Sequence, residues 1–164
     1  MCIRDRPQIF TNAKRLAAEG VHMDVGHGAA SFNFQVAQEA IADGLKPFSI
    51  STDLHGWSLN GPVYDLATTV SKLYAVGLTL EECVNAIARN PRNFLALHET
   101  TSLVVGSKAD LTVFNVSDCE ESVIDSQGNS LVLKSVFEPT RVISGCKSYV
   151  AERTQMSGNI KNIN

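Results

Sequence analysis

Two short stretches of the sequence end in side chains that can do chemistry. The first, Val21–Val25, runs into Gly26-His27-Gly28, and the second, Phe48–Asp53, runs into Leu54-His55. Apolar and polar residues alternate along both stretches, which predicts two β-strands with one polar face each. A carboxylate or an imidazole at the end of a strand can bind a divalent metal, accept a proton or contact a substrate.

Asp53 is the first candidate among these residues. Strand alternation places Asp24 and Asp53 on the face opposite Val25 and Ile50, so both carboxylates are expected on the polar side of a sheet. A carboxylate at the end of a parallel strand can ligate a metal or accept a proton from metal-bound water. The alternative is an aspartate that caps a helix or braces a loop.

Two histidines accompany this carboxylate. His27 lies between two glycines, which allow the backbone to approach a ligand closely. It fits a substrate contact or a metal ligand, and it fits equally a loop histidine held by hydrogen bonds. His55 has the same two interpretations. His22 stands at the far end of its strand and His98 at a helix end, so we interpret these as structural and surface residues.

Other chemistries have weaker support in the sequence. Gly26–Ser31 resembles the dinucleotide-binding G-x-G-x-x-G with Asp53 as the ribose acid, but its third position is Ser31. Asp53 also follows Gly28 by 25 residues, where ~20 is expected. No G-x-S-x-G elbow supports a serine nucleophile. The four cysteines have no C-x-x-C spacing, which favours small buried side chains in a reducing cytoplasm.

The elements that must position these residues alternate between helix and strand up to residue 98. Apolar stripes at helical spacing, glycine stops and a Thr79–Glu82 capping box predict the helices. The expected helices are 7–19, 31–43, 62–76, one from Thr79 that stops before Asn90-Pro91, and 92–97. Strands alternating with covering helices imply an α/β fold with a parallel sheet.

The remainder of the chain has a different pattern. After Glu99, turn residues separate short β-type runs, which predict a small all-β part over residues 99–153 and a flexible tail over 154–164. The predicted strands are 103–105, 110–116, 122–124, 131–137, 140–144 and 148–151. We therefore divide the chain into residues 7–98 and 99–153.

Composition limits the class of protein. The 164 residues are 44% hydrophobic and 19% charged, with a net charge of −3. These values are typical of a globular chain and give no basic surface for nucleic acid or an anionic membrane. The apolar runs are shorter than the ~20 residues that a bilayer span requires, and no signal peptide is evident. We expect a cytoplasmic protein with a small-molecule substrate.

Two observations indicate that the sequence is a C-terminal fragment. Two parallel strands with their helices leave two open sheet edges, so the predicted parallel sheet is incomplete. The charged string formed by residues 1–6 joins abruptly to a well-formed helix start at Pro7, and we interpret it as non-native sequence.

Four segments together resemble one enzyme family. Val21–Gly28, Ile50–His55, Asn90–Asn93 and Gly106–Leu111 are similar to the closing part of amidohydrolase-superfamily enzymes, nearest to the dihydroorotase-like amidohydrolases and deacetylases. The resemblance covers nearly all of residues 7–151. It implies the C-terminal part of a (β/α)₈ TIM barrel, namely its last two strands and helices, plus part of a small β-sandwich domain.

The resemblance also implies a chemistry. Family members hold one or two Zn²⁺ ions and hydrolyse an N-acyl amide, a cyclic amide or an ester with metal-activated hydroxide. Here Asp53 would be metal ligand and proton acceptor, with His27, Gly28 and His55 contacting substrate. A homo-oligomer of the intact protein is compatible with this family.

This chain departs from the family pattern, because it has no His-x-His and no strand-end lysine. One carboxylate cannot retain a catalytic zinc, which needs about three protein ligands. We therefore predict an active intact parent and an inactive isolated chain. The alternatives are a metal-free assembly protein with this fold, or a nucleotide-binding domain that uses Gly26–Ser31.

Overall fold

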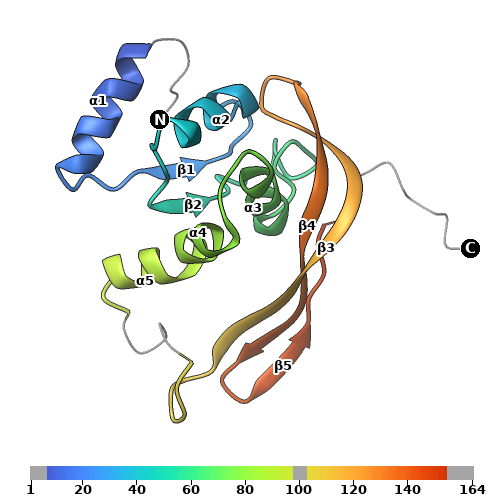
Figure 1. The fold of residues 1–164 in the computed structure, drawn as a ribbon. Coiled ribbons are helices and arrows are strands. Elements are labelled where there is room, and N and C mark those ends of the chain that lie inside the picture. The colour runs from blue at the N-terminus through green and yellow to red at the C-terminus, as the bar shows by residue number, and fades with distance from the viewer. Residues whose placement is uncertain (1–6, 98–102, 155–164) are drawn as a thin grey trace, which may run out of the picture.

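Two short parallel strands and a set of helices form the first half of the computed structural model, which describes residues 7–97 and 103–154. Figure 1 shows these elements beside a long β-hairpin that forms the second half. In chain order the elements of the first half are α1 (Pro7–Ala18), β1 (Asp24–Gly26), α2 (Phe34–Ala42), β2 (Ser49–Ser51), α3 (Leu66–Ala75), α4 (Leu80–Val84), the π-helical η1 (Asn85–Arg89) and α5 (Asn90–Phe94).

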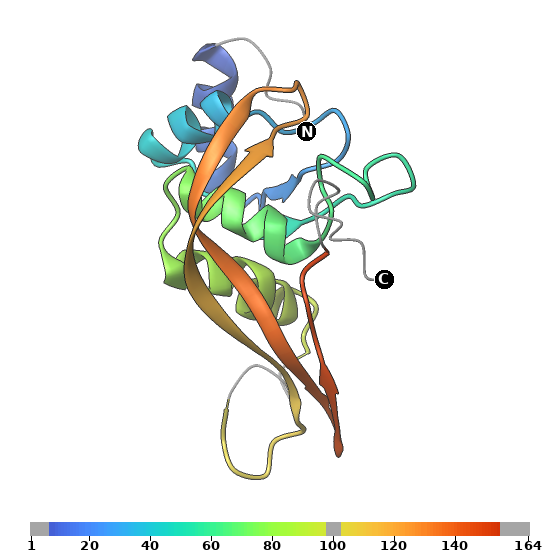
Figure 2. The same cartoon turned by 90° about the vertical axis from the view of Figure 1, so that its right-hand side faces the viewer.

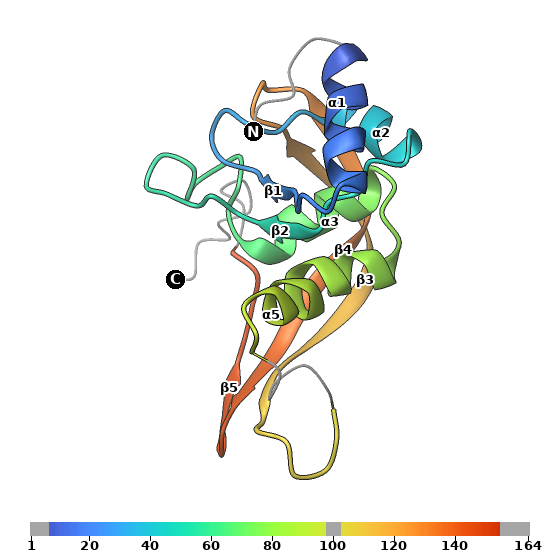
Figure 3. The same cartoon turned by 90° about the vertical axis from the view of Figure 1, so that its left-hand side faces the viewer.

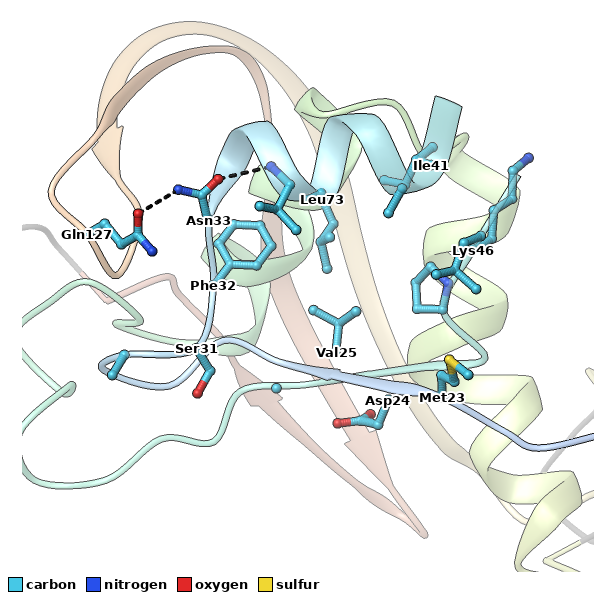
Figure 4. A pocket seen from close by; sticks show the side chains of 17 residues that line it. Met23, Asp24, Val25, Ser31, Phe32, Asn33, Ile41, Lys46, Leu73 and Gln127 are labelled. Atoms are coloured by element: carbon cyan, nitrogen blue, oxygen red, sulfur yellow. Dashed lines mark hydrogen bonds between the residues drawn. The ribbon is translucent and has the colours of Figure 1, made fainter. Parts of the chain in front are cut away.

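The two predicted strands pair in parallel, as the helix–strand alternation indicates. Val25 lies opposite Ile50 in the register, and Asp24 lies opposite Ser49. Val25 points toward the apolar side chains of Phe32 and Leu73, whereas Asp24 points to the other side of the strand (Figure 4). The expected separation into a polar and an apolar face is therefore confirmed. Both strands are only three residues long, shorter than predicted.

Helix α3 lies between the two sheets. The β1–β2 pair is on one side of it and the hairpin on the other (Figures 1 and 3). This position explains why six consecutive residues of α3, Thr68 to Leu73, are buried. The predicted helix was too long at its start: Asp65, not Pro62, begins the helix by accepting a hydrogen bond from the backbone N–H of Thr68.

The β part consists of three strands in one antiparallel sheet, in the order β3 (Asp110–Ile124), β4 (Ser130–Ser144) and β5 (Lys147–Val150). Figure 2 shows the long β3–β4 hairpin crossing in front of the helices. The predicted division of residues 110–144 into four short strands is therefore wrong, because they form two long ones, whereas the predicted strand 148–151 is confirmed as β5. Register shifts at Val113/Phe114 and Asp118/Glu121 interrupt the alternation that marks a strand, yet pairing continues through them.

Two further predictions of local structure need correction. Leu103–Val105 is not a strand. The helix from Thr79 does not stop before Asn90-Pro91, because η1 carries it directly into α5. The N–H of Asn90 bonds to the carbonyl oxygen of Asn85, five residues back, and this wider turn absorbs a proline that an α-helix interior does not tolerate. The Thr79–Glu82 capping box is confirmed.

One hydrophobic core joins both halves of the described chain. It combines Phe32, Phe34, Ile50, Val70, Leu73, Val76, Leu78, Cys83 and Ala86 of the first half with Val123, Leu133, Val136 and Phe137 of the hairpin. The residue sets 7–98 and 99–153 that we separated as domains therefore pack on one another. Residues 1–6, His98 and nearly all of the predicted tail lie outside the described residues.

The cysteines differ in their surroundings. Cys83 is buried, Cys119 is half-buried and Cys146 is exposed, and all three are free thiols. Burial raises the pKa of the Cys83 thiol to about 12, which suits the packing role that we expected. The same expectation is wrong for Cys146, which is exposed. Within the described residues, no helix is both long enough and apolar enough to cross a membrane.

Candidate active site

Asp53 stands two residues after the end of β2 and its side chain is exposed. Its backbone has φ of +47°, a left-handed conformation that non-glycine residues rarely adopt and that turns the chain sharply at the strand end. Strain of this kind persists where the surrounding structure fixes the residue, and it is common at functional sites.

The Gly26–Gly28 loop provides the surroundings of Asp53. A Cβ atom on Gly28 would lie 2.6 Å from Asp53 Oδ2, and a Cβ on Gly26 would lie 3.4 Å from the Asp53 Cβ. Gly28 also has φ of +53°, and its N–H donates to the carbonyl oxygen of Thr52 at 3.0 Å. The two glycines therefore leave the space that the Asp53 side chain occupies.

A second carboxylate lies on the same polar face. Asp24 accepts hydrogen bonds from the hydroxyls of Ser49 at 2.7 Å and Ser51 at 2.5 Å. Its Oδ2 would be 3.8 Å from a Cβ on Gly26, so Asp24 and Asp53 flank that glycine. The serines occupy one oxygen each of Asp24, which makes Asp53 the more available of the two carboxylates.

The side chain of His27, the middle residue of the Gly26–Gly28 loop, is fully buried. Its Nδ1 is 2.9 Å from the carbonyl oxygen of Gly28, and its Nε2 is 2.9 Å from Nζ of Lys72. Burial and the nearby Lys72 charge lower the pKa of His27 to about 4, so the ring is neutral at physiological pH. This position matches the second of our two interpretations, a loop histidine held by hydrogen bonds. A substrate contact through His27 stays a prediction.

His55 belongs to an exposed loop after β2. Its Nδ1 accepts a hydrogen bond from the backbone N–H of Trp57 at 3.3 Å, and its carbonyl oxygen accepts one from the Ser58 N–H. Trp57 is 89% exposed. His22 stacks on Phe48 with ring centroids 3.7 Å apart, which agrees with the structural role that we assigned to it.

Three polar residues behind the site were not predicted from the sequence, of which two are buried and one is half-buried. Lys72 of α3 is fully buried, and its ammonium donates to His27 and to the carbonyl oxygens of Pro62 and Ile124. Burial lowers the pKa of Lys72 to about 8, although the carboxylates of Asp125 and Asp65 oppose this shift. Nothing in the local pattern could identify Lys72, because its partners are 10 to 52 residues away.

The other two polar residues, Asp125 and Ser126, lie at the tip of the β3–β4 hairpin. Burial opposes ionisation of Asp125, but hydrogen bonds from Asn129 and from the N–H groups of Gln127 and Phe34 outweigh it and lower its pKa. Ser126 Oγ lies 3.2 Å from the carbonyl oxygen of His27 and 3.0 Å from that of Gly28. The hairpin tip thus contacts the Gly26–Gly28 loop through the Ser126 hydroxyl and two carbonyl oxygens of the loop.

The same tip bears on the nucleotide-binding alternative. The start of α2 is capped by the Asn33 side chain, and Asp125 Oδ2 accepts from the N–H of Phe34 at 3.1 Å. A helix N-terminus binds phosphate through its free N–H groups and its positive dipole end. A phosphate here would meet the Asp125 carboxylate, so the structure disfavours a dinucleotide on Gly26–Ser31.

The donor set on this chain does not form a zinc site by itself. Within residues 7–97 and 103–154, no three His, Cys, Asp or Glu side chains gather closely enough to hold a metal ion. Catalytic zinc needs about three protein ligands, and of the two carboxylates on this polar face Asp24 has a serine hydroxyl on each oxygen. Asp53 can act as a single ligand or as a proton acceptor.

Comparison with known proteins shows what this chain is similar to. Residues 103–149 match the deacetylase-like composite domain. The chain is 48% identical over 151 residues to the deacetylase Atu3266 of Agrobacterium fabrum, and 44% identical over 151 residues to a deacetylase of Brucella anthropi. These matches cover 92% of this chain but 37% and 38% of the two relatives, so the chain spans little more than a third of their length.

Solved structures agree with the sequence relatives. A dihydroorotase crystal structure superposes with a TM-score of 0.87 at 46% identity, over 93% of this chain and 40% of that one. An adenine deaminase superposes with a TM-score of 0.80 at 39% identity, over 84% of this chain and 38% of that one. The mixed α/β fold and the similarity to amidohydrolase-type hydrolases, both expected from the sequence, are thereby supported.

Proposed function

We propose that this chain is the closing part of a metal-dependent amidohydrolase that hydrolyses an N-acyl amide, a cyclic amide or an ester of a small molecule. The observation that carries the proposal is the Asp53 carboxylate, held at the end of a parallel strand by the Gly26–Gly28 loop. The named deacetylase relatives support hydrolysis of an acyl group as the reaction class.

In this proposal β1 and β2 are the last two strands of a (β/α)₈ barrel, whose active site lies at the carboxyl ends of its strands. Asp53 lies at that end, together with the exposed loop of His55. The hairpin belongs to the accompanying β-sandwich domain. The remaining strands and the other metal ligands would come from outside this chain.

Asp53 acts as proton acceptor in the proposed reaction. It takes a proton from the attacking water and delivers it to the leaving nitrogen or oxygen, so that the carboxylate is regenerated in each cycle. Exposure of the carboxylate allows contact with both groups. Zn²⁺, when held by ligands of the complete protein, would supply polarisation of the carbonyl and a more acidic water. His55 and the Gly28 backbone are proposed substrate contacts.

A chimeric enzyme tests this proposal. Residues 7–154 of this chain replace the matching segment of the Agrobacterium deacetylase, and zinc-dependent deacetylation is measured on a panel of N-acetyl compounds and esters. Asp53→Asn should lower kcat/KM at least about 100-fold, as expected for loss of a general base. Asp118→Asn, at an exposed aspartate of β3, is the matched control and should leave kcat/KM unchanged.

Other outcomes contradict specific parts of the proposal. An Asp53→Asn chimera with full activity would exclude Asp53 from the reaction. A folded chimera that neither binds zinc nor hydrolyses any substrate would instead favour the metal-free assembly protein. Zinc-dependent turnover by the isolated 164-residue chain would show that the missing ligands are not needed.

A further inference from the structure

We infer that Lys72 is a positioning residue, which fixes the Gly26–Gly28 loop from inside the protein and thereby sets the position of Asp53. The inference rests on the proposed function only in giving Asp53 a role in the reaction. The positioning itself follows from contacts among buried groups.

Lys72 connects three separate segments of the chain. Its Nζ donates to the carbonyl oxygen of Pro62 before α3, to that of Ile124 at 2.7 Å on the hairpin, and to Nε2 of His27 at 2.9 Å. An ammonium group has three protons, and these three acceptors use all of them. A fully buried lysine is costly unless its charge is satisfied in this way.

The lysine also dictates the state of the His27 ring. Nζ can only donate, so Nε2 must be the unprotonated acceptor and the ring proton must be on Nδ1. Nδ1–H then donates to the carbonyl oxygen of Gly28 at 2.9 Å. Lys72 therefore favours the same tautomer as the Gly28 carbonyl oxygen, which can only accept, and supports a hydrogen bond that ends on the residue next to the Asp53 carboxylate.

The path from Lys72 to Asp53 is short and continuous. Gly28 is held on its carbonyl side by His27, and on its N–H side by the carbonyl oxygen of Thr52 at 3.0 Å, next to Asp53 in the chain. A Cβ on Gly28 would meet Asp53 Oδ2 at 2.6 Å, so a movement of this glycine toward β2 displaces the carboxylate. Loss of the Nδ1–H donor leaves the Gly28 carbonyl oxygen with the Ser126 hydroxyl and therefore holds it less firmly.

Ser126 supports the same loop independently. Its hydroxyl lies 3.2 Å from the carbonyl oxygen of His27 and 3.0 Å from that of Gly28. It also accepts from the N–H of Phe32 at 3.2 Å. Removing this hydroxyl should loosen the loop without changing the His27 tautomer, because Ser126 does not contact the ring nitrogens.

NMR of the uniformly ¹⁵N-labelled chain at pH 7, which shows both the histidine ring nitrogens and the backbone amides, separates positioning from simple stabilisation. His27→Gln assigns the His27 signals among the four histidines. In the wild type the Nδ1–H tautomer is expected. Lys72→Met, which keeps the side-chain length but removes the donor, should convert His27 to the Nε2–H tautomer or to a mixture. It should also shift the amide signals of Gly28 and Asp53, while Tyr149 on β5 stays unchanged.

Lys46→Met is the matched control. Lys46 is an exposed lysine paired with Glu82, and its replacement should leave the His27 tautomer and the Gly28 and Asp53 signals as in the wild type. In the chimeric deacetylase, Lys72→Met should lower kcat/KM at least tenfold, because it displaces both the Asp53 carboxylate and the Gly28 backbone that is a proposed substrate contact. Lys46→Met should leave kcat/KM unchanged.

Several results would overturn the inference. A folded Lys72→Met chain with an unchanged His27 tautomer, or with unchanged Gly28 and Asp53 signals, excludes positioning by Lys72. If Lys72→Met does not fold, His27→Gln decides, because it removes the ring that links Lys72 to Gly28: Gly28 and Asp53 signals that do not move overturn the inference. A chimera without activity in its unsubstituted form would refute the proposed function alone, since the NMR result remains valid.

Discussion

Gly28→Ala tests whether the glycine loop and Asp53 fit together as the structure shows. A left-handed backbone with φ of +53° costs an alanine roughly 1–2 kcal/mol relative to glycine. The new Cβ would also lie 2.6 Å from Asp53 Oδ2, too close for any carbon–oxygen contact. Because that oxygen ends a short exposed side chain, we expect the carboxylate to rotate away rather than the loop to unfold.

Gly44→Ala provides the comparison. Gly44 has φ of +84°, after the end of α2, and nothing lies within 4 Å of its ideal Cβ position. Both variants should therefore lower the free energy of unfolding by a similar amount, roughly 1–2 kcal/mol. Only Gly28→Ala should move the ¹³C signal of the Asp53 carboxyl group. In the chimeric deacetylase it alone should lower kcat/KM, by at least about tenfold.

The assay combines urea unfolding followed by circular dichroism with carboxyl-detected NMR. An unchanged Asp53 carboxyl signal in Gly28→Ala would refute the close contact between Gly28 and Asp53. A loss of stability about 4 kcal/mol larger than that of Gly44→Ala would refute the free rotation of the carboxylate. In that case the loop and Asp53 would form a rigid unit.

Two further predictions concern buried groups. The pKa of His27 is lowered to about 4, so the unfolded chain binds a proton first as the pH falls below the ordinary value of 6.5. Between pH 7 and pH 4, the free energy of unfolding of the wild type should therefore fall by about 3 kcal/mol more than that of His27→Gln. Urea unfolding at each pH measures both values. Parallel pH profiles of the two proteins would contradict the buried neutral ring. Leu133→Ala on β4 removes a fully buried side chain and should lower the free energy of unfolding by about 2–5 kcal/mol. Val132→Ala, at a neighbouring side chain that is 49% exposed, should lower it by less than about 1 kcal/mol. Equal losses in the two variants would place the hairpin outside the core.

Local patterns were sufficient to predict the polar face of the site. Alternation along β1 and β2 separates Asp24, Ser49 and Ser51 from Val25 and Ile50, because successive strand residues point to opposite faces. The strand-end position of Asp53 and the two glycines beside it were likewise evident from residue order. These features depend on neighbours within a few positions, which a sequence displays directly.

The support behind the site could not be predicted in the same way. Lys72 lies on a helix whose apolar stripe suggested one buried face, but α3 is buried on two sides because sheets cover both of them. A lysine is normally expected in solvent. Ser126 and Asp125 occupy a segment that we interpreted as an ordinary turn, because the groups they bond, in residues 27–34, are more than 90 positions away.

The long sequence separation between the hairpin tip and the glycine loop also sets an order of events during synthesis. Ser126 bonds to His27 and Gly28 across 99 and 98 positions. At ~5–20 residues per second, a ribosome needs roughly 5–20 s to make that intervening chain. Until the hairpin emerges, the nascent loop lacks its final partners, and folding through such distant contacts is slow. The loop beside Asp53 is thus translated before the hairpin and reaches its final conformation only after the hairpin has emerged.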